Sequence, residues 1–171
     1  MPMKATLDLR FTTGNSPLGP MLVATTARGV CALLLGDEAC TASLQARFPQ
    51  ARLSEDAKGL TPLLKRVRDW LAQPAGALEL ELDLQGTAFQ RRVWQALQKI
   101  PSGTTLSYAD LARRLRLPTA ARAVASACAR NPVALAVPCH RVVRSDGGLA
   151  GYRWGVELKR KLVASEAALV E

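Results

Sequence analysis

The stretch GTAFQRRVWQALQKIPSG, residues 86–103, divides the chain into two parts with different patterns. Thr87 followed three residues later by Gln90 has the form of a capping box, in which two side chains pair with backbone N–H groups at a helix start. Apolar residues then recur at helical spacing until the Pro-Ser-Gly end of the stretch, which stops a helix. The sequence therefore predicts a helix over residues 87–100.

The part before this stretch has the patterns of short strands. Three apolar runs are separated by Gly, Pro and Asn, which is typical of strands joined by turns. They are residues 6–12, 21–26 and 30–35. The strict alternation of Leu with Glu or Asp over residues 78–84 indicates a further half-buried strand, and the apolar spacing over residues 60–72 indicates a helix. This part predicts a small α/β lobe, and no chemistry is visible in it.

The part after the stretch is mainly helical. A second helix is expected to begin at Ser107 and to stop before Pro118, and Thr119 can cap a third helix over residues 120–130. Two short helices across a tight turn are a helix-turn-helix candidate. The predicted fold class is therefore α+β.

The third predicted helix is unusually rich in alanine, which leaves a slim surface that can approach another backbone closely. A tightly packed buried helix would have the same composition. The position of this helix after a helix and a turn favours a role at a nucleic-acid groove, where Arg122 would be the side chain with the longest reach.

Charge separates the two predicted lobes, which are residues 1–86 and residues 87–171. The first contains nine Lys and Arg and nine Asp and Glu, whereas the second contains fourteen and five and so accounts for the net charge of +9. A basic segment of this kind indicates a polyanionic partner, and nucleic acid is the commonest. A solvated basic surface kept for solubility is the alternative.

The remaining composition indicates the compartment. The first ten residues hold no apolar run of signal-peptide length, and no run has the length of a membrane span, so we expect a cytoplasmic protein without a membrane partner. The four cysteines have no CxxC spacing and the chain has one histidine, so free thiols are expected rather than a zinc site.

The sequence PCHRV at residues 138–142 holds the candidate reactive atom. A thiolate is a nucleophile, and neighbouring positive charge lowers the pKa of a thiol, which makes Cys139 beside His140 and Arg141 the candidate. Adjacent side chains do not face each other on a strand or a helix, so contact between Cys139 and His140 needs a turn or a bridging water.

Taken together, the motifs of residues 86–171 resemble the methylated-DNA–protein-cysteine alkyltransferases, which repair guanine alkylated at O6. Those that carry the resemblance, in chain order, are TAFQ at 87–90 with Trp94, Ile100-Pro101 with Gly103, Ser107-Tyr108, Arg122-Ala123-Val124, Asn131-Pro132, PCHRVV at 138–143 and Gly151-Tyr152. Within the family, residues 121–129 and 151–156 are most similar to the C-terminal domain of bacterial adaptive-response proteins. The resemblance implies a ribonuclease H-like N-terminal lobe with a short antiparallel sheet.

The resemblance implies five catalytic residues. Cys139 would accept the alkyl group, and His140 would take the thiol proton through a water. Glu166 would orient the imidazole and balance its charge. Tyr108 would help to rotate the nucleotide and would protonate the leaving guanine, while Asn131 would brace the turn that holds the cysteine.

The resemblance also implies a DNA surface and a base pocket. Arg122 would fill the gap left in the duplex by the extruded nucleotide. The DNA-binding residues would be Thr119, Ala121, Arg122, Ala123, Ser126 and Arg130. The pocket residues would be Tyr108, Val142, Tyr152, Arg153 and Trp154. Some members hold zinc through N-terminal histidines that this chain lacks, so no metal and no cofactor are expected.

The expected activity is a single, irreversible transfer from guanine O6, with thymine O4 left open, by a monomer acting on double-stranded DNA that contains alkylated guanine. The thioether formed at Cys139 has no good leaving group, so each molecule would act once. Two alternatives remain: a DNA-binding module that recognises damage without transfer, and a cysteine hydrolase. The hydrolase would need a base on a separate segment facing the thiol.

Overall fold

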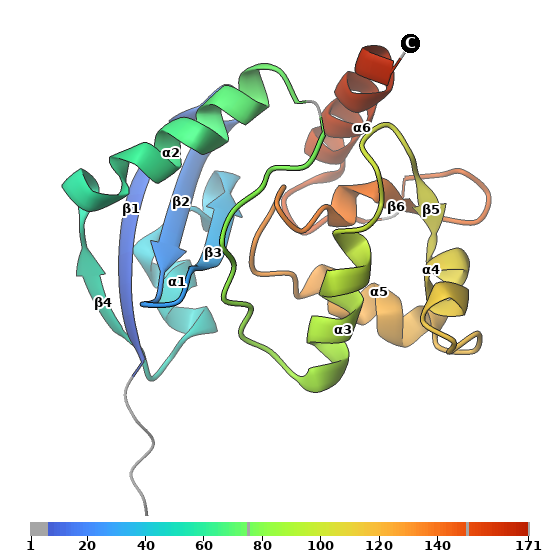
Figure 1. The fold of residues 1–171 in the computed structure, drawn as a ribbon, viewed down its shortest axis with the longest axis horizontal. Coiled ribbons are helices and arrows are strands. Elements are labelled where there is room, and N and C mark those ends of the chain that lie inside the picture. Colours follow the sequence, from blue (N-terminus) through green and yellow to red (C-terminus); the bar gives the residue numbers. More distant parts are fainter. Residues whose placement is uncertain (1–6, 75, 150, 171) are drawn as a thin grey trace, which may run out of the picture.

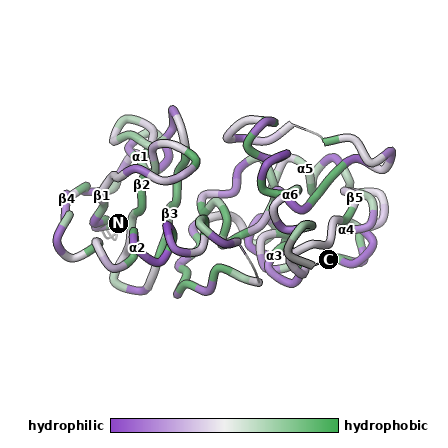
Figure 2. Tube along the Cα trace, turned by 90° about the horizontal axis from the view of Figure 1, so that it is seen from above, coloured by the Kyte–Doolittle hydropathy of each residue, from purple (hydrophilic) through white to green (hydrophobic). Residues whose placement is uncertain are grey.

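The computed structural model describes residues 7–74, 76–149 and 151–170 and has a mixed α+β fold. Figure 1 shows a sheet with one long helix across one of its faces and a group of helices beside one edge of the sheet. Seen from above in Figure 2, the strand next to the helical group is β3 (Val30–Leu35). The α+β class predicted from the sequence is confirmed.

The sheet has the strand order β3-β2-β1-β4. The strands are β1 (Asp8–Ser16), β2 (Gly19–Thr25), β3 (Val30–Leu35) and β4 (Arg52–Glu55). Antiparallel pairing joins β1 to β2 and β2 to β3, whereas β4 lies parallel to β1. The connection from β3 to β4 carries a 3-10 turn, η1 (Gly36–Glu38), and helix α1 (Thr41–Arg47). The first predicted strand begins at Thr6, which lies outside the described residues.

Both faces of β3 are buried because the sheet separates two apolar clusters. Leu33 and Leu35 pack into the larger cluster with helix α2 (Ala57–Ala72), whereas Ala32 and Leu34 pack into the smaller cluster with α1. This alternation follows from the two-residue period of a strand. The predicted helix over residues 60–72 is confirmed as most of α2.

The outer edge of β3 contacts two distant segments of the chain. The backbone N–H of Leu33 donates to Pro132 O at 2.9 Å, and that of Ala134 donates to Leu33 O at 3.0 Å. A second segment makes one bridge, between Val30 and Leu82. The edge strand is thereby covered, and the loop that precedes Cys139 is anchored to the sheet.

The prediction of a β-strand over residues 78–84 is wrong, because this segment does not form a continuous set of strand hydrogen bonds. This segment pairs with β3 at Leu82 alone and is otherwise without regular structure. Its alternation is nevertheless real, since Leu78, Leu80 and Leu82 pack on the larger cluster while Glu79 and Glu81 are exposed. Alternation reports which side chains are buried, and it does not require a partner strand.

Helix α3 (Ala88–Leu97) begins with the predicted capping box. The backbone N–H of Gln90 donates to the Thr87 hydroxyl at 3.1 Å, and the backbone N–H of Thr87 donates to Gln90 Oε1 at 3.0 Å. The Trp94 ring lies so close to Gly86 that a β-carbon there would be 2.6 Å from it. The chain therefore turns into α3 at a position that only glycine fits.

The remaining elements build the helical part. They are β5 (Leu106–Ser107), α4 (Tyr108–Arg114), α5 (Ala121–Ala129), the 3-10 turn η2 (Cys139–Arg141), β6 (Val142–Val143) and α6 (Val156–Val170). Ser107 caps α4 as predicted, since its hydroxyl accepts from the Asp110 N–H at 3.0 Å. Thr119 does not cap α5: the cap is Ala120, without a side-chain hydrogen bond, because a turn that closes from Leu117 to Ala120 leads into the helix.

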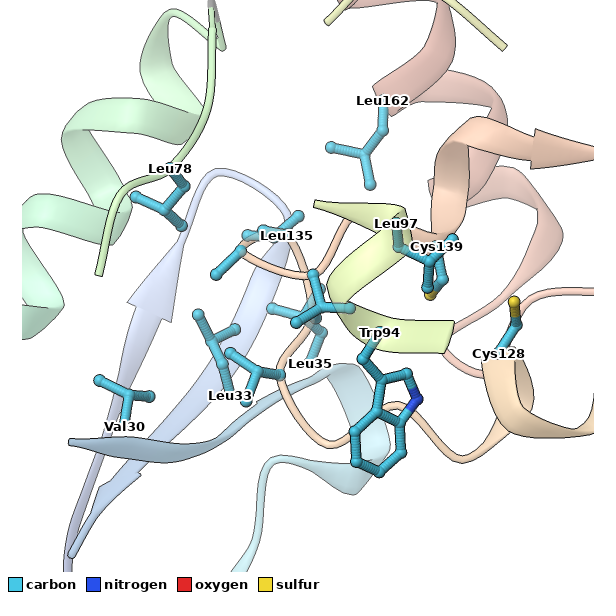
Figure 3. Packing of buried hydrophobic residues seen from close by; sticks show 14 of the residues in the cluster. Val30, Leu33, Leu35, Leu78, Trp94, Leu97, Cys128, Leu135, Cys139 and Leu162 are labelled. Atoms are coloured by element: carbon cyan, nitrogen blue, oxygen red, sulfur yellow. The ribbon is translucent and has the colours of Figure 1, made fainter. Parts of the chain in front are cut away.

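The larger apolar cluster extends from the sheet to the candidate site. Figure 3 shows Leu33 and Leu35 beside Leu135 and Trp94, with Cys139 farther along the same cluster. The indole N–H of Trp94 donates to the Ala127 carbonyl on α5 at 2.9 Å. Packing and this hydrogen bond hold α3 and α5 in a fixed relation to the sheet. None of the described helices is both long enough and apolar enough to cross a membrane.

Candidate functional site

Asn131 holds the loop that carries Cys139. Its side-chain amide donates to the Val137 carbonyl at 2.8 Å and to Cys139 Sγ at 3.2 Å, while its Oδ1 accepts from the Val133 N–H at 2.9 Å. Asn131 is fully buried, and all these partners lie within the loop. One side chain therefore fixes both the backbone of the turn and the position of the sulfur. Leu135, inside the same turn, has a φ of 70°, which costs energy for a residue other than glycine.

Cys139 is 4% exposed, but it lines a cavity of about 360 Å³. That volume is typical of sites for small ligands. The cavity walls come from α4, α5, η2 and the segment before α6. The described residues that line it are Tyr108, Ala125, Cys128, Ala129, Cys139, Gly151, Tyr152 and Arg153. The sulfur is thus buried in the protein and accessible from the cavity.

The Cys139 thiol is not activated in the way predicted from its neighbours in the sequence. Burial raises its pKa to about 11, although the hydrogen bond from Asn131 and the charges of Lys159 and Arg153 act to lower it. The prediction of a lowered pKa is wrong because burial outweighs these lowering effects, and because Arg141 hydrogen-bonds to Glu166 instead of the thiol. The thiol therefore holds its proton at neutral pH and needs a base.

His140, Glu166 and Arg141 form a buried cluster next to the thiol-bearing turn. His140 Nε2 lies 2.6 Å from Glu166 Oε1. Arg141 donates to both carboxylate oxygens, at 2.8 Å from Nε and 3.0 Å from Nη2, and also to the Ile100 carbonyl at 2.7 Å. Burial alone would raise the pKa of Glu166, but the hydrogen bonds from His140 and Arg141 outweigh it and lower that pKa to about 2.

The cluster determines the form of the imidazole. A carboxylate can only accept, so the proton of a neutral His140 lies on Nε2 and the lone pair lies on Nδ1. Nδ1 is buried and has no hydrogen-bond partner among the described residues. Burial lowers the pKa of His140 although Glu166 acts to raise it, because Arg141 already balances the carboxylate charge. His140 is therefore a neutral base with its accepting nitrogen unused.

Tyr108 provides an acid in the same cavity. It is the first residue of α4, is half-buried, and lines the cavity together with Cys139. Burial, with the nearby Cys128 and Cys139, raises the pKa of Tyr108 to about 12. The phenol therefore keeps its proton at neutral pH and can donate it.

Helix α5 has one open face next to this cavity. Val124, Ala127 and Cys128 are buried against the protein, whereas most of the side chains predicted to bind DNA are on the solvent side. The predicted residues that are exposed are Thr119, Arg122, Ala123, Ser126 and Arg130, and Ala121 is half-buried. Since Ala125 and Ala129 line the cavity, the open face and the cavity adjoin.

The predicted base pocket is only partly assembled. Tyr108, Tyr152 and Arg153 line the cavity, but Val142 and Trp154 are not among its described lining residues. Val142 is buried and pairs with Leu106 in the two-stranded sheet of β5 and β6. Trp154 packs edge-on against Tyr152 with 5.3 Å between ring centroids, so it supports the wall from behind.

Comparison with known proteins places this geometry in a family. The family model described as the DNA-binding domain of 6-O-methylguanine DNA methyltransferase matches residues 88–168. A methylated-DNA–protein-cysteine methyltransferase of Mycobacterium tuberculosis is 35% identical over 158 residues, which cover 92% of this chain and 92% of that protein. The chain belongs to the methylated-DNA–protein-cysteine methyltransferases.

Two further relatives show how much of the chain is similar to known proteins in structure and in sequence. The crystal structure of Mycobacterium tuberculosis OGT in complex with DNA superposes with a TM-score of 0.80 at 34% identity, covering 95% of this chain and 94% of that chain. The bifunctional transcriptional activator and DNA repair enzyme Ada of Escherichia coli is 48% identical over 166 residues, which cover 94% of this chain and 46% of Ada. The chain thus spans about half the length of this relative.

Sequence reasoning missed two buried charges at the candidate site. The sequence predicts Arg141 as a source of positive charge near the thiol, whereas its guanidinium pairs with Glu166. Lys159 on α6 is fully buried; burial lowers its pKa, and the field of Cys139 acts on it in the opposite sense. Helical spacing could have indicated that Lys159 is buried. Lys159, Leu162 and Glu166 lie on one face of α6, and all three side chains are buried.

Proposed function

We propose that this protein transfers a methyl or other alkyl group from O6 of guanine in double-stranded DNA to Sγ of Cys139. The observation that carries the proposal is the cavity in which a thiol and a phenol meet beside the open face of α5. Family membership and the solved complex of a relative with DNA support the choice of DNA as the substrate. The thioether product has no good leaving group, so each molecule acts once.

The first step removes the proton from Cys139. The raised pKa of the thiol requires a base, and Nδ1 of His140 is the unpaired acceptor in the turn. Because the two residues are adjacent in sequence, a bridging water would carry the proton from Sγ to Nδ1. Glu166 then stabilises the imidazolium through Nε2, which is the role of the third group in a nucleophile–base–carboxylate arrangement.

The second step displaces guanine from the alkyl carbon. The S–C bond forms as the C–O6 bond breaks, and guanine leaves with the electron pair of that bond. Tyr108 protonates the leaving base, and the proton retained on His140 balances the one that Tyr108 gives up. Asn131 keeps Sγ in place through its 3.2 Å hydrogen bond during the attack. No metal or cofactor enters these steps.

DNA recognition in this proposal uses α4 and α5 as a helix-turn-helix. The slim, exposed side of α5 enters a groove, and Arg122 occupies the space left in the duplex by the flipped nucleotide. Flipping is needed because the alkyl carbon of a stacked base is out of reach, and it costs a few kcal/mol. Sequence-independent repair favours phosphate contacts from the basic residues of this part of the chain.

The two predicted lobes have different roles in this proposal. Residues 87–171 bind DNA and carry out the transfer, and residues 1–86, a ribonuclease H-like lobe, hold the Asn131 loop through the edge of β3. The protein acts as a cytoplasmic monomer. Guanine O6 is the proposed site of attack, and thymine O4 is a second substrate to be tested in parallel.

The experiment that tests this function follows the loss of lesions with a known amount of protein. A duplex with one O6-methylguanine is added in excess, and the amount of lesion remaining is measured over time. The proposal predicts a plateau after one lesion is removed per protein molecule, and no removal by Cys139→Ser. Continued turnover beyond one equivalent would indicate a hydrolase, and binding without loss of lesion would indicate a recognition module.

A further inference from the structure

A second cavity, of about 520 Å³, lies where the end of α1 meets the end of α5. No step of the proposed transfer uses it. Its lining is polar and basic, with guanidinium groups from both parts of the chain. The lining residues that matter here are Arg47, Arg130, Arg153, Glu38 and Gln85.

The positive charges in this cavity exceed the negative ones. Glu38 is the one acidic side chain among its described lining residues, and it already pairs with Arg153 at 2.6 Å. Arg47 donates to the backbone carbonyl of Arg130, which carries no net charge. The guanidinium of Arg130 makes no hydrogen bond or ion pair with any described residue. Two positive charges are therefore left without a carboxylate.

This arrangement is electrostatically unfavourable without a ligand. Burial, together with the charges of Arg153 and Arg130, lowers the pKa of Arg47 to about 10, and Glu38 only partly opposes this. Like charges held together at a partly buried site repel more strongly than they would in water. An anion between the guanidinium groups would reverse the sign of the interaction, and a planar guanidinium binds phosphate oxygens well.

The position of the cavity indicates which anion it would bind. Arg153 lines both this cavity and the one that holds Cys139, and its Nη1 lies 3.4 Å from the Asn131 carbonyl. Arg130 is the residue that ends α5, directly after Ala129 of the Cys139 cavity. A nucleotide that enters the Cys139 cavity past this end of α5 carries a phosphate on each side of its sugar.

We propose that Arg47, Arg130 and Arg153 form a phosphate site for the DNA backbone next to the extruded nucleotide. This inference rests on the proposed function, because it takes DNA as the substrate and extrusion as the way in. It extends the DNA contact from α5 to α1 in the sheet-containing part of the chain. In this proposal the ion pair with Glu38 is a positioning contact, because it holds the Arg153 side chain between the two cavities.

The test measures how DNA affinity depends on salt in variants of Arg47. Each neutralised phosphate contributes about 0.9 to the slope of log K against log salt. The variants are Arg47→Gln and Arg47→Lys, with Arg130→Gln as a second variant if Arg47→Gln folds poorly. Arg52→Gln is the matched control, because Arg52 is exposed on β4, outside the cavity, and the change removes the same charge. All proteins carry Cys139→Ser so that no transfer occurs during the titration.

The proposal predicts that Arg47→Gln and Arg130→Gln each reduce the slope by about 0.9 on a duplex with O6-methylguanine. Arg47→Lys should keep the wild-type slope, since its charge remains, and so should Arg52→Gln. On a duplex without a lesion, in which no nucleotide is extruded, the Arg47→Gln effect should be smaller.

Three results would overturn the proposal. The first is an equal slope for Arg47→Gln and the Arg52→Gln control. The second is an equal loss on damaged and undamaged duplexes, which would separate the site from the extruded nucleotide. The third is thermal stabilisation by inorganic phosphate that Arg47→Gln abolishes without any change in DNA affinity, which would assign the cavity to a free anion. Lesion removal by protein with Cys139 intact is measured separately, so failure of the proposed function remains distinguishable.

Discussion

His140 Nε2 lies 2.6 Å from Glu166 Oε1, and both side chains are almost completely shielded from solvent. This contact leaves Nδ1 of the imidazole as the accepting nitrogen for the thiol of the neighbouring residue. Arg141 donates to the same carboxylate, so Glu166 does not force His140 to be protonated. The arrangement therefore keeps a neutral, buried base next to the turn that carries the thiol.

The pH dependence of transfer tests this state of His140. Burial lowers the pKa of His140 from its ordinary value of 6.5, so the neutral base persists as the pH falls through 6.5. The rate of transfer from a free O6-alkylguanine base should stay level from pH 8 to pH 6.5 and fall only below that. A midpoint above pH 6.5 would mean that Glu166 holds His140 in its charged form.

Replacement of Glu166 should weaken both folding and catalysis. Glu166→Gln leaves Arg141 buried without a carboxylate, which should lower the free energy of unfolding by about 3 kcal/mol at pH 7. Transfer should slow because the imidazolium loses its charge partner. Glu157→Gln on the same helix is the control, because Glu157 is exposed and its ion pair with Arg160 contributes little. Urea unfolding measures the first effect, and single-turnover rates measure the second.

The stability difference between wild type and Glu166→Gln should depend on pH. The pKa of Glu166 lies near 2, against an ordinary value of 4.5, so its contribution is full above pH 4.5 and is lost as the pH falls towards 2. The difference between the urea midpoints should therefore be full at pH 7, become smaller between pH 4.5 and pH 3, and vanish only near pH 2. A constant difference over this range would mean that the charge of Glu166 does not stabilise the fold.

Asn131→Ala should disrupt the turn that holds the thiol. The change leaves the Val133 N–H and the Val137 carbonyl unpaired in the core, at a cost of about 3 kcal/mol in the free energy of unfolding. It also removes the hydrogen bond that lowers the pKa of Cys139, so the thiol should ionise at higher pH. Thermal unfolding and the pH dependence of thiol alkylation measure the two effects. Asn15→Ala, at an exposed position in β1, should change neither.

Arg122→Ala tests the proposed role of α5 in nucleotide flipping. Loss of the inserted side chain should slow repair of a duplex about tenfold or more, which corresponds to about 1.4 kcal/mol of the unstacking cost. Transfer from a free base should be unaffected, because no nucleotide is flipped there. Arg91→Ala removes the same charge from an exposed position on α3 and serves as the control. Equal losses in the two assays would argue against insertion of Arg122.

Local signals in the sequence were sufficient for the elements they specify. The capping box at Thr87 and Gln90 set the start of α3, and Ser107 set the start of α4, because each cap involves residues only three apart. The predictions that failed depend on distant residues. Whether residues 78–84 pair as a strand depends on the edge of β3, and helix α1 and strand β4 were missed because both are short and have weak patterns.

At the candidate site, too, the sequence predicts the features that depend on neighbouring residues and misses those that depend on distant ones. The motif around Cys139 indicated the nucleophile, but its pKa depends on burial, which adjacent residues do not reveal. The direction of Arg141 follows from the packing of α6, whose residues are about 25 positions away in the chain. The arginine cluster was invisible for the same reason, since Arg47 and Arg130 meet only in the folded chain.

One sulfur, Sγ of Cys139, receives the alkyl group in the proposed reaction. Cys128 lines the same cavity, and burial raises its pKa even further, so it is the internal control for this claim. Peptide mapping by mass spectrometry after reaction with an O6-methylguanine duplex should find one added methylene on the peptide of Cys139, both in wild type and in Cys128→Ser. A methyl group on Cys128, or lesion removal by Cys139→Ser, would contradict the account.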